Sequence, residues 1–263
     1  MASLTTHKEF QAARRLPFCY LCGKTFQDED IKDGDHVPPK SCFAKADRNV
    51  PLELPTHVVC NHAHHLLDEK IGQVIGLKRE HIPAVKDRRL KFKILPLTSN
   101  LDLSGAISDV DIKGAIRRYI FGFHAALYQE PMPKSIAFGV NTPFPTATIS
   151  GGKLRHDPLL PQHALFVHVV KINRFARNLD RIRSNNGKML YECVWKQTDG
   201  GPWICVFALN IYDWKDLGSQ HLPSRGCVGF YTGRSGLPPV NATRAIQIVV
   251  AVPNYDPLDA FGR

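Results

Sequence analysis

Two pairs of side chains with the spacing of metal ligands stand close together in the first quarter of the chain. Cys19 and Cys22 are separated by two residues, and His57 and Cys60 repeat that spacing. Two ligands at this spacing can fold onto one ion, and a tetrahedral structural site takes four sulfur and nitrogen donors. The spacing therefore predicts one structural Zn2+ ion held by these four residues. The alternative is that the cysteines are ordinary buried thiols and that the histidine is incidental.

The residues between and just after these pairs could hydrolyse a phosphodiester. Asp35 and His36 are adjacent, Asn49 follows them, and Asn61 comes directly after the last cysteine. An imidazole titrates near neutral pH and can take a proton from water as a general base. Carboxylate and amide oxygens suit a hard cation such as Mg2+ or Mn2+. Taken alone, Asp35 and His36 favour a turn with an unremarkable exposed histidine over a catalytic pair.

In this order, and framed by the two metal pairs, the residues resemble the HNH (ββα-metal) endonucleases, in a branch that contains a zinc knuckle. The resemblance covers residues 18 to about 72. It implies that His36 is the general base, that Asp35 and Asn61 hold the catalytic cation, and that Asn49 orients the imidazole. Asn61 stands where this family often has its last histidine, so the chain resembles a His-Asn-Asn variant.

Several neighbouring residues are weaker candidates. His65 lies four residues after Asn61, on the same face of an expected helix, and could join the cation or be a partly exposed polar residue. Asp68 and Glu69 resemble an acidic pair of this branch, and their role stays open between a helix-packing salt bridge and support of the site. Lys40 could contact a phosphate or simply be exposed to solvent.

The charge of the chain favours a polyanionic partner. Lysine and arginine number 34 against 24 acidic residues, a formal net charge of +10. Nucleic acid is the first candidate partner, and the family resemblance favours double-stranded DNA. Residues 77–96 are strongly basic and include Arg88 and Arg89. This segment is either a solvated helix and connector or a surface that contacts phosphates.

The fold class predicted from these patterns is α+β. A ββα-metal unit over residues 15–75, in which a hairpin supplies Asp35 and His36 and a helix supplies Asn61, belongs to a nuclease domain over 1–95. Residues 96–263 are expected to form a helix over 109–129, capped by Asp109 or Asp111, and a mainly antiparallel sheet. Four stretches predict strands: 163–172, 188–196, 201–214 and 245–253. This C-terminal region could position the substrate, bind a protein partner or form a homodimer.

The composition excludes some classes of protein. The chain is 43% apolar, which is ample for a core, and it has no apolar run long enough to predict a membrane span. Its start lacks the features of a secretory signal, and its seven cysteines are an odd number, so a reducing, cytoplasmic location is expected. The predicted function is a metal-dependent endonuclease, of the size seen in mobile elements or antiviral systems. The alternative is a non-catalytic, zinc-stabilised nucleic-acid-binding protein.

Overall fold

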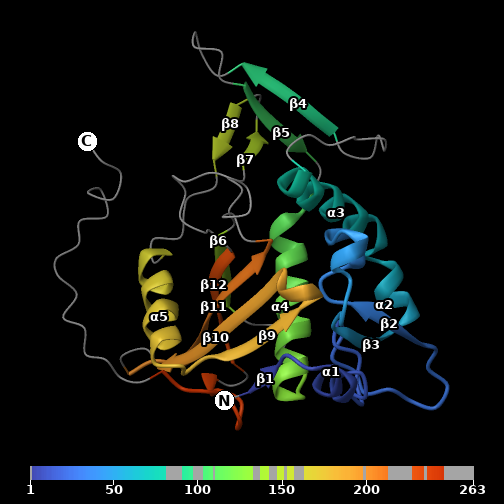
Figure 1. Ribbon diagram of the computed structural model, residues 1–263, viewed down its shortest axis with the longest axis vertical. Coiled ribbons are helices and arrows are strands. Elements are labelled where there is room, and N and C mark those ends of the chain that lie inside the picture. The colour runs from blue at the N-terminus through green and yellow to red at the C-terminus, as the bar shows by residue number, and fades with distance from the viewer. Residues whose placement is uncertain are drawn as a thin grey trace.

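The computed structural model is a mixed α+β structure built on one large sheet, shown in Figure 1. It describes residues 2–80, 91–96, 103–108, 110–132, 137–141, 147–150, 153–156, 163–197, 200–212, 227–233 and 236–245. The α+β class with a mainly antiparallel sheet, predicted from the sequence, is confirmed.

The large sheet has six strands, and every pairing in it except one is antiparallel. Its order is β1-β9-β10-β11-β12-β6, and the exception is β1, which pairs parallel to β9. The long central pair β10–β11 joins two of the strands predicted from the sequence, those over 188–196 and 201–214, with Met189 opposite Ile211 and Gln197 opposite Trp203. The strands are β1 (Ser3–Leu4), β6 (Phe138–Asn141), β9 (Asp180–Ser184), β10 (Met189–Gln197), β11 (Trp203–Ile211) and β12 (Cys227–Thr232).

Two helices cover the two faces of this sheet, α4 (Ile112–Tyr128) on one and α5 (His163–Phe175) on the other (Figure 1). Side chains alternate between the faces along each strand. Cys193 and Trp195 belong to the core on the α4 side, whereas Val194 between them packs on the α5 side. The predicted helix over 109–129 is therefore confirmed, and its N-cap is Asp111.

The predicted strand over 163–172 is wrong, because these residues form helix α5. Val169 and Val170 lie three and four residues after Phe166, and all three pack together against the sheet. This spacing places them on one face of a helix, and burial against the sheet outweighs the β propensity of the valines. The predicted strand over 245–253 lies outside the described residues except for its first position.

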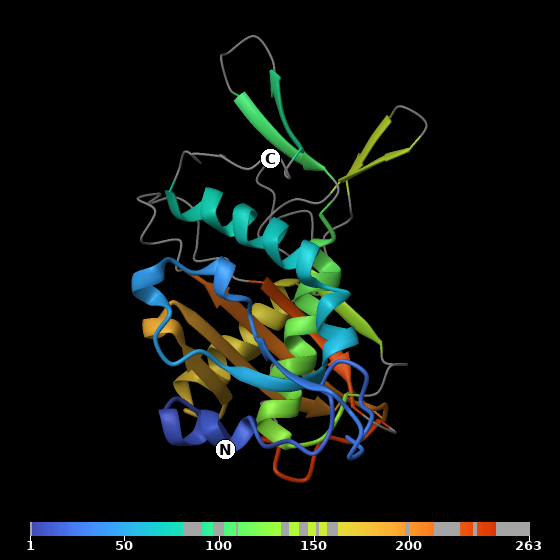
Figure 2. The same cartoon turned by 90° about the vertical axis from the view of Figure 1, so that its right-hand side faces the viewer.

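The N-terminal part of the chain packs on the outer side of α4, as Figures 1 and 2 show. Its small antiparallel hairpin meets α4 at Gly122, where a Cβ atom would lie only 2.8 Å from Val37 and 3.1 Å from Leu54. A larger residue there would push the hairpin away. The elements of this part are α1 (His7–Ala13), β2 (Lys32–His36), β3 (Glu53–His57), α2 (Val58–His62), α3 (His65–Glu80) and the short 3-10 turns η1 (Lys40–Cys42) and η2 (Lys45–Asp47).

One hydrophobic core joins the N-terminal part to the large sheet. Leu54 of the hairpin, Phe123 of α4 and Tyr191 of the sheet are all essentially inaccessible to solvent and belong to the same cluster. Residues before and after the domain boundary expected near residue 95 therefore share this core, and α4 lies between the two parts.

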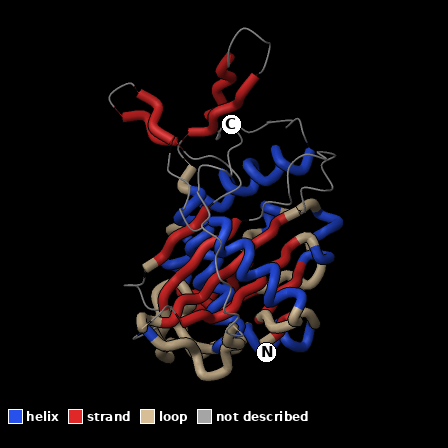
Figure 3. Tube along the Cα trace, turned by 90° about the vertical axis from the view of Figure 1, so that its left-hand side faces the viewer, coloured by secondary structure: helices blue, strands red, loops and turns tan. Residues whose placement is uncertain are grey.

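Two further hairpins extend beyond one end of the sheet, as Figures 1 and 3 show. They pair β4 (Lys91–Pro96) with β5 (Leu103–Ser108) and β7 (Ala147–Ser150) with β8 (Lys153–His156).

Candidate metal centre and adjoining polar residues

The two predicted ligand pairs meet at one end of the β2–β3 hairpin. The ligand atoms of Cys19, Cys22, His57 and Cys60 all lie within 4.8 Å of one another. The two cysteines of the first pair lie in a tight turn that Gly23 closes with a φ of +75°, a conformation that side chains disfavour. His57 is the last residue of β3, and Cys60 follows in α2. Within the described parts of the chain, no other group of three or more His, Cys, Asp or Glu side chains could hold a metal ion.

The geometry and donor set of this cluster fit a metal ion such as zinc. Nδ1 of His57 lies 3.4 Å from Sγ of Cys22 and 4.0 Å from Sγ of Cys60. These distances are close to the edges of about 3.5 to 3.8 Å expected for a tetrahedron of zinc–sulfur and zinc–nitrogen bonds. The other ring nitrogen of His57, Nε2, lies 3.2 Å from a carboxylate oxygen of Asp30. A carboxylate in this position orients a ligating imidazole and leaves Nδ1 free for the metal.

The thiols have unequal proton affinities. Burial raises the pKa of Cys19, but hydrogen bonds from the Thr56 hydroxyl and nearby backbone amides outweigh it and lower the pKa to about 7. Burial raises the pKa of Cys60 to about 12, and the neighbouring Cys19 and Cys22 add to the rise. Three thiolates this close repel one another, so a bound cation would favour their ionised forms together.

His36 lies at the opposite end of the hairpin from the cysteines. It ends β2, pairs with Glu53 across the hairpin, and its side chain is 18% exposed. Its Nε2 lies 3.7 Å from Oε2 of Glu53. The same oxygen forms an ion pair with the guanidinium of Arg14 at 2.7 Å. Burial lowers the pKa of His36, and the ammonium group of Lys40 lowers it further. A neutral imidazole is the form that can accept a proton.

The side chain of Asp35 is buried in the protein. It is 5% exposed, and one of its carboxylate oxygens accepts a hydrogen bond from the Tyr20 hydroxyl. Burial raises its pKa, whereas the guanidinium of Arg118 in α4 opposes the rise. Arg118 itself is ion-paired with Asp68 of α3, whose pKa burial raises to about 6. Of the two roles left open for Asp68, the structure shows a salt bridge in helix packing.

Asn61 contacts a carboxylate other than the expected one. Its side-chain amide donates a hydrogen bond of 2.8 Å to Oδ2 of Asp33, and both residues lie near the surface. This hydrogen bond lowers the pKa of Asp33, and the backbone amide of Gly34 adds to the effect. Asp33 and Asp35 are two residues apart on β2 and so share one face of the strand. Among the described contacts, no hydrogen bond joins Asn61 to Asp35.

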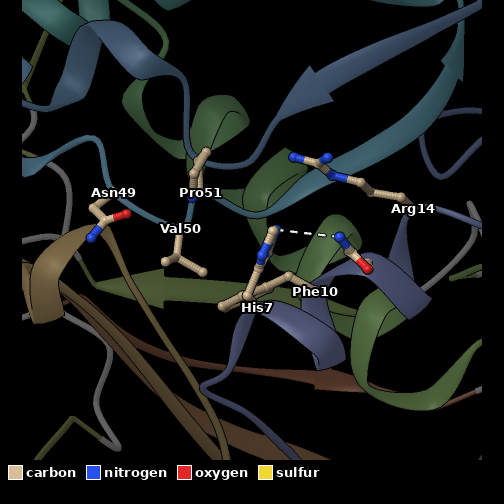
Figure 4. Close-up of a pocket in the computed structure, with 7 residues that line it drawn as sticks. His7, Phe10, Arg14, Asn49, Val50 and Pro51 are labelled. Atoms are coloured by element: carbon tan, nitrogen blue, oxygen red, sulfur yellow. Dashed lines mark hydrogen bonds between the residues drawn. The ribbon is translucent and has the colours of Figure 1, made fainter.

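The remaining predicted residues are placed as follows. Asn49 lies in the wall of a hollow beside α1, as Figure 4 shows. His65 is 77% exposed and faces Glu69 at 3.8 Å, and Lys40 is exposed at the start of η1. Arg88 and Arg89 lie outside the described residues.

Four residues near these centres were not predicted from the sequence. Asp30 and Asp33 belong to no recognised motif. The only indication in the sequence is that both are acidic and lie between the two ligand pairs. Arg14 and Arg118 come from α1 and α4, and their positions depend on packing between distant segments.

No family model, no curated protein and no solved structure matches this chain. Among the helices that the structure describes, none combines the length and the apolar character needed to cross a membrane.

Proposed function

We propose that this protein is a divalent-metal-dependent endonuclease that hydrolyses phosphodiester bonds, with DNA as the favoured substrate. The observation that carries the proposal is the position of His36. It is a partly exposed histidine with a lowered pKa, and it lies on the same two-stranded hairpin that ends in the Cys3His cluster. The cluster would hold a structural Zn2+ and brace the hairpin that presents the imidazole.

His36 would take the proton from the attacking water, with Glu53 beside its Nε2. A Mg2+ or Mn2+ ion on the Asp33–Asp35 face of β2, with Asn61 as a further ligand, would polarise the phosphate and stabilise the leaving oxygen. Asn49 would orient the loop that precedes β3. The net charge of +10 supports a polyanionic substrate.

The proposal is tested by conversion of supercoiled plasmid DNA to nicked or linear forms. Protein dialysed free of Mg2+ should cut only after Mg2+ or Mn2+ is restored. His36→Ala should lower the rate by about a hundredfold or more, because general bases contribute on that order. The control His168→Ala removes an exposed histidine of α5, far along the chain from the hairpin, and should cut at the parent rate. A His36→Ala protein that is folded and cuts as fast as the parent would show that His36 is not the base.

The two carboxylates on β2 provide a test of the cation site. Asp33→Asn and Asp35→Asn each remove a charge while keeping the shape of the side chain. At least one should raise the Mg2+ concentration for half-maximal cutting by about tenfold, since a carboxylate is the main charged ligand available there. The larger shift identifies the direct ligand. Asp28→Asn removes an exposed acid elsewhere and should leave the Mg2+ dependence unchanged. If both hairpin variants have the parent's Mg2+ dependence, the cation does not bind on this face.

A second function is favoured by the burial of Asp35. A carboxylate that is 5% exposed and hydrogen-bonded to Tyr20 is poorly placed to bind a cation from solvent. In that case the protein would be a zinc-stabilised nucleic-acid-binding protein without catalysis. It would bind DNA without cutting it in Mg2+ or Mn2+, and its affinity would fall steeply as salt is added.

A further inference from the structure

A hollow of about 150 Å³ lies between α1 and the loop that leads into β3. Residues from two separate segments form its walls, and Figure 4 shows their side chains around it. The lining residues are His7, Phe10, Gln11, Arg14, Asn49, Val50 and Pro51. This hollow is not part of the metal cluster or of the Asp33–Asp35 face.

The hollow is connected to His36 through a single carboxylate oxygen. Arg14, in the wall, donates to Oε2 of Glu53 at 2.7 Å, and Nε2 of His36 lies 3.7 Å from the same oxygen. The Arg14 guanidinium therefore lies close to the position that a scissile phosphodiester would take at His36.

The lining has the character of a site for an anionic group attached to a flat, apolar one. It contains the cationic Arg14, whose side chain is 42% exposed, and the side-chain amides of Gln11 and Asn49. None of its lining residues is acidic. Val50 and Pro51, which are half-buried, provide an apolar surface, and the buried Phe10 supports it from behind.

The loop wall is held in an unusual backbone conformation. Val50 has a φ of +48°, in the left-handed region that a β-branched residue rarely adopts. Such strained residues persist where the surrounding structure fixes them, and they concentrate at functional sites. The strain at Val50 is therefore consistent with a wall whose shape matters.

We propose that this hollow receives one unpaired nucleotide of the nucleic-acid strand, next to the phosphodiester at His36, with its phosphate on Arg14 and its base against Val50 and Pro51. This inference rests on the proposed nuclease function. A base can enter such a hollow only when it is out of the duplex, so single-stranded or locally opened nucleic acid should bind better than a closed duplex.

Binding can be measured without cleavage in the His36→Ala protein, in the absence of divalent cations. The probe is a fluorescein-labelled single-stranded DNA of eight nucleotides, followed by fluorescence anisotropy. In this background Arg14→Gln should weaken binding by about tenfold, as expected for a lost phosphate contact in a formed site. The matched control Arg15→Gln removes the same charge from the next residue, which is exposed and outside the hollow, and should weaken binding by less than about twofold.

Two further measurements separate the possible outcomes. His7→Ala changes the hollow without removing the contact with Glu53, and it should weaken binding by about threefold even if the Arg14 variant folds poorly. Hydrolysis of bis(p-nitrophenyl) phosphate by the protein with His36 intact tests the proposed function apart from nucleotide binding, because the only phosphate of this ester would lie at His36, and Arg15→Gln should retain it. If this ester is hydrolysed but the Arg14, His7 and Arg15 variants bind DNA alike, or the duplex binds better than the single strand, the hollow holds no nucleotide. If the protein neither binds DNA nor hydrolyses the ester, the proposed function itself fails.

Discussion

Replacing Cys60 by alanine is expected to release the bound metal and to unfold the β2–β3 hairpin. The four ligands come from the turn before β2, the end of β3 and helix α2, so a bound ion would join three segments of the chain. Structural Zn2+ binding contributes about 10–16 kcal/mol in small zinc-finger peptides at neutral pH. We therefore expect less than stoichiometric zinc by elemental analysis, a lower midpoint of thermal unfolding, and faster hydrogen exchange of the hairpin amides.

Cys42→Ala is the matched control for this experiment. Cys42 is also a buried cysteine of the N-terminal part, and burial raises its pKa to about 12. It lies outside the ligand cluster, so its variant should keep one zinc ion per chain and slow exchange in the hairpin. A Cys60→Ala protein with a full complement of zinc and the parent's unfolding midpoint would contradict a structural metal site.

Replacing Arg118 by leucine is expected to lower the free energy of unfolding by about 3–5 kcal/mol. The Arg118 side chain is 4% exposed, pairs with Asp68, and lies close enough to Asp35 to act on its pKa. Its removal would leave the buried carboxylate of Asp35 and the half-buried one of Asp68 without this compensating cation, which is a large penalty in the protein interior. Urea denaturation at neutral pH, followed by circular dichroism, measures the change.

Arg117→Leu is the control on the same helix. The guanidinium of Arg117 is only partly buried and lies 5.4 Å from the ring centre of Phe121, a contact worth about 0.5–1 kcal/mol. The double variant Arg118→Leu/Asp68→Leu should recover part of the lost stability, because it removes one of the unpaired charges. Equal losses in the Arg117 and Arg118 variants would show that the buried network contributes nothing beyond an ordinary surface arginine.

The parts of the structure that depend on short-range spacing could be predicted from the sequence. Each ligand pair, helix α4 with an aspartate cap at 109 or 111, and strands β10 and β11 follow from patterns within about 20 residues, whereas the hairpin between the ligand pairs is expected from the family resemblance. Residues 163–175 could not be assigned in this way. A run of valine and phenylalanine satisfies both a strand and a buried helix, and only packing against the sheet decides between them.

The arrangement around Asp35 depends on contacts that no local pattern contains. Alternation along β2 predicts that Asp35 and His36 face opposite sides, but not which side is closed. The side of β2 that carries Asp35 is covered by α4. The Arg118 side chain of α4 pairs with Asp68, which is 50 residues away along the chain, so no local pattern contains this contact. Similarly, Asp33 and Asn61 are 28 residues apart and meet only because α2 folds back on the hairpin. That Asn61 is a cation ligand and that His36 is a general base both stay predictions.

The position of His57 links metal binding to strand alignment. This residue pairs with Lys32 at one end of the hairpin, and His36 pairs with Glu53 at the other. A shift of one residue in this pairing would turn every side chain of a strand to the opposite surface. Coordination of His57 would therefore do more than add stability: it would favour the alignment in which an imidazole, and not a carboxylate, is exposed to solvent at the far end. Without a bound metal ion, the chain would lack this selection.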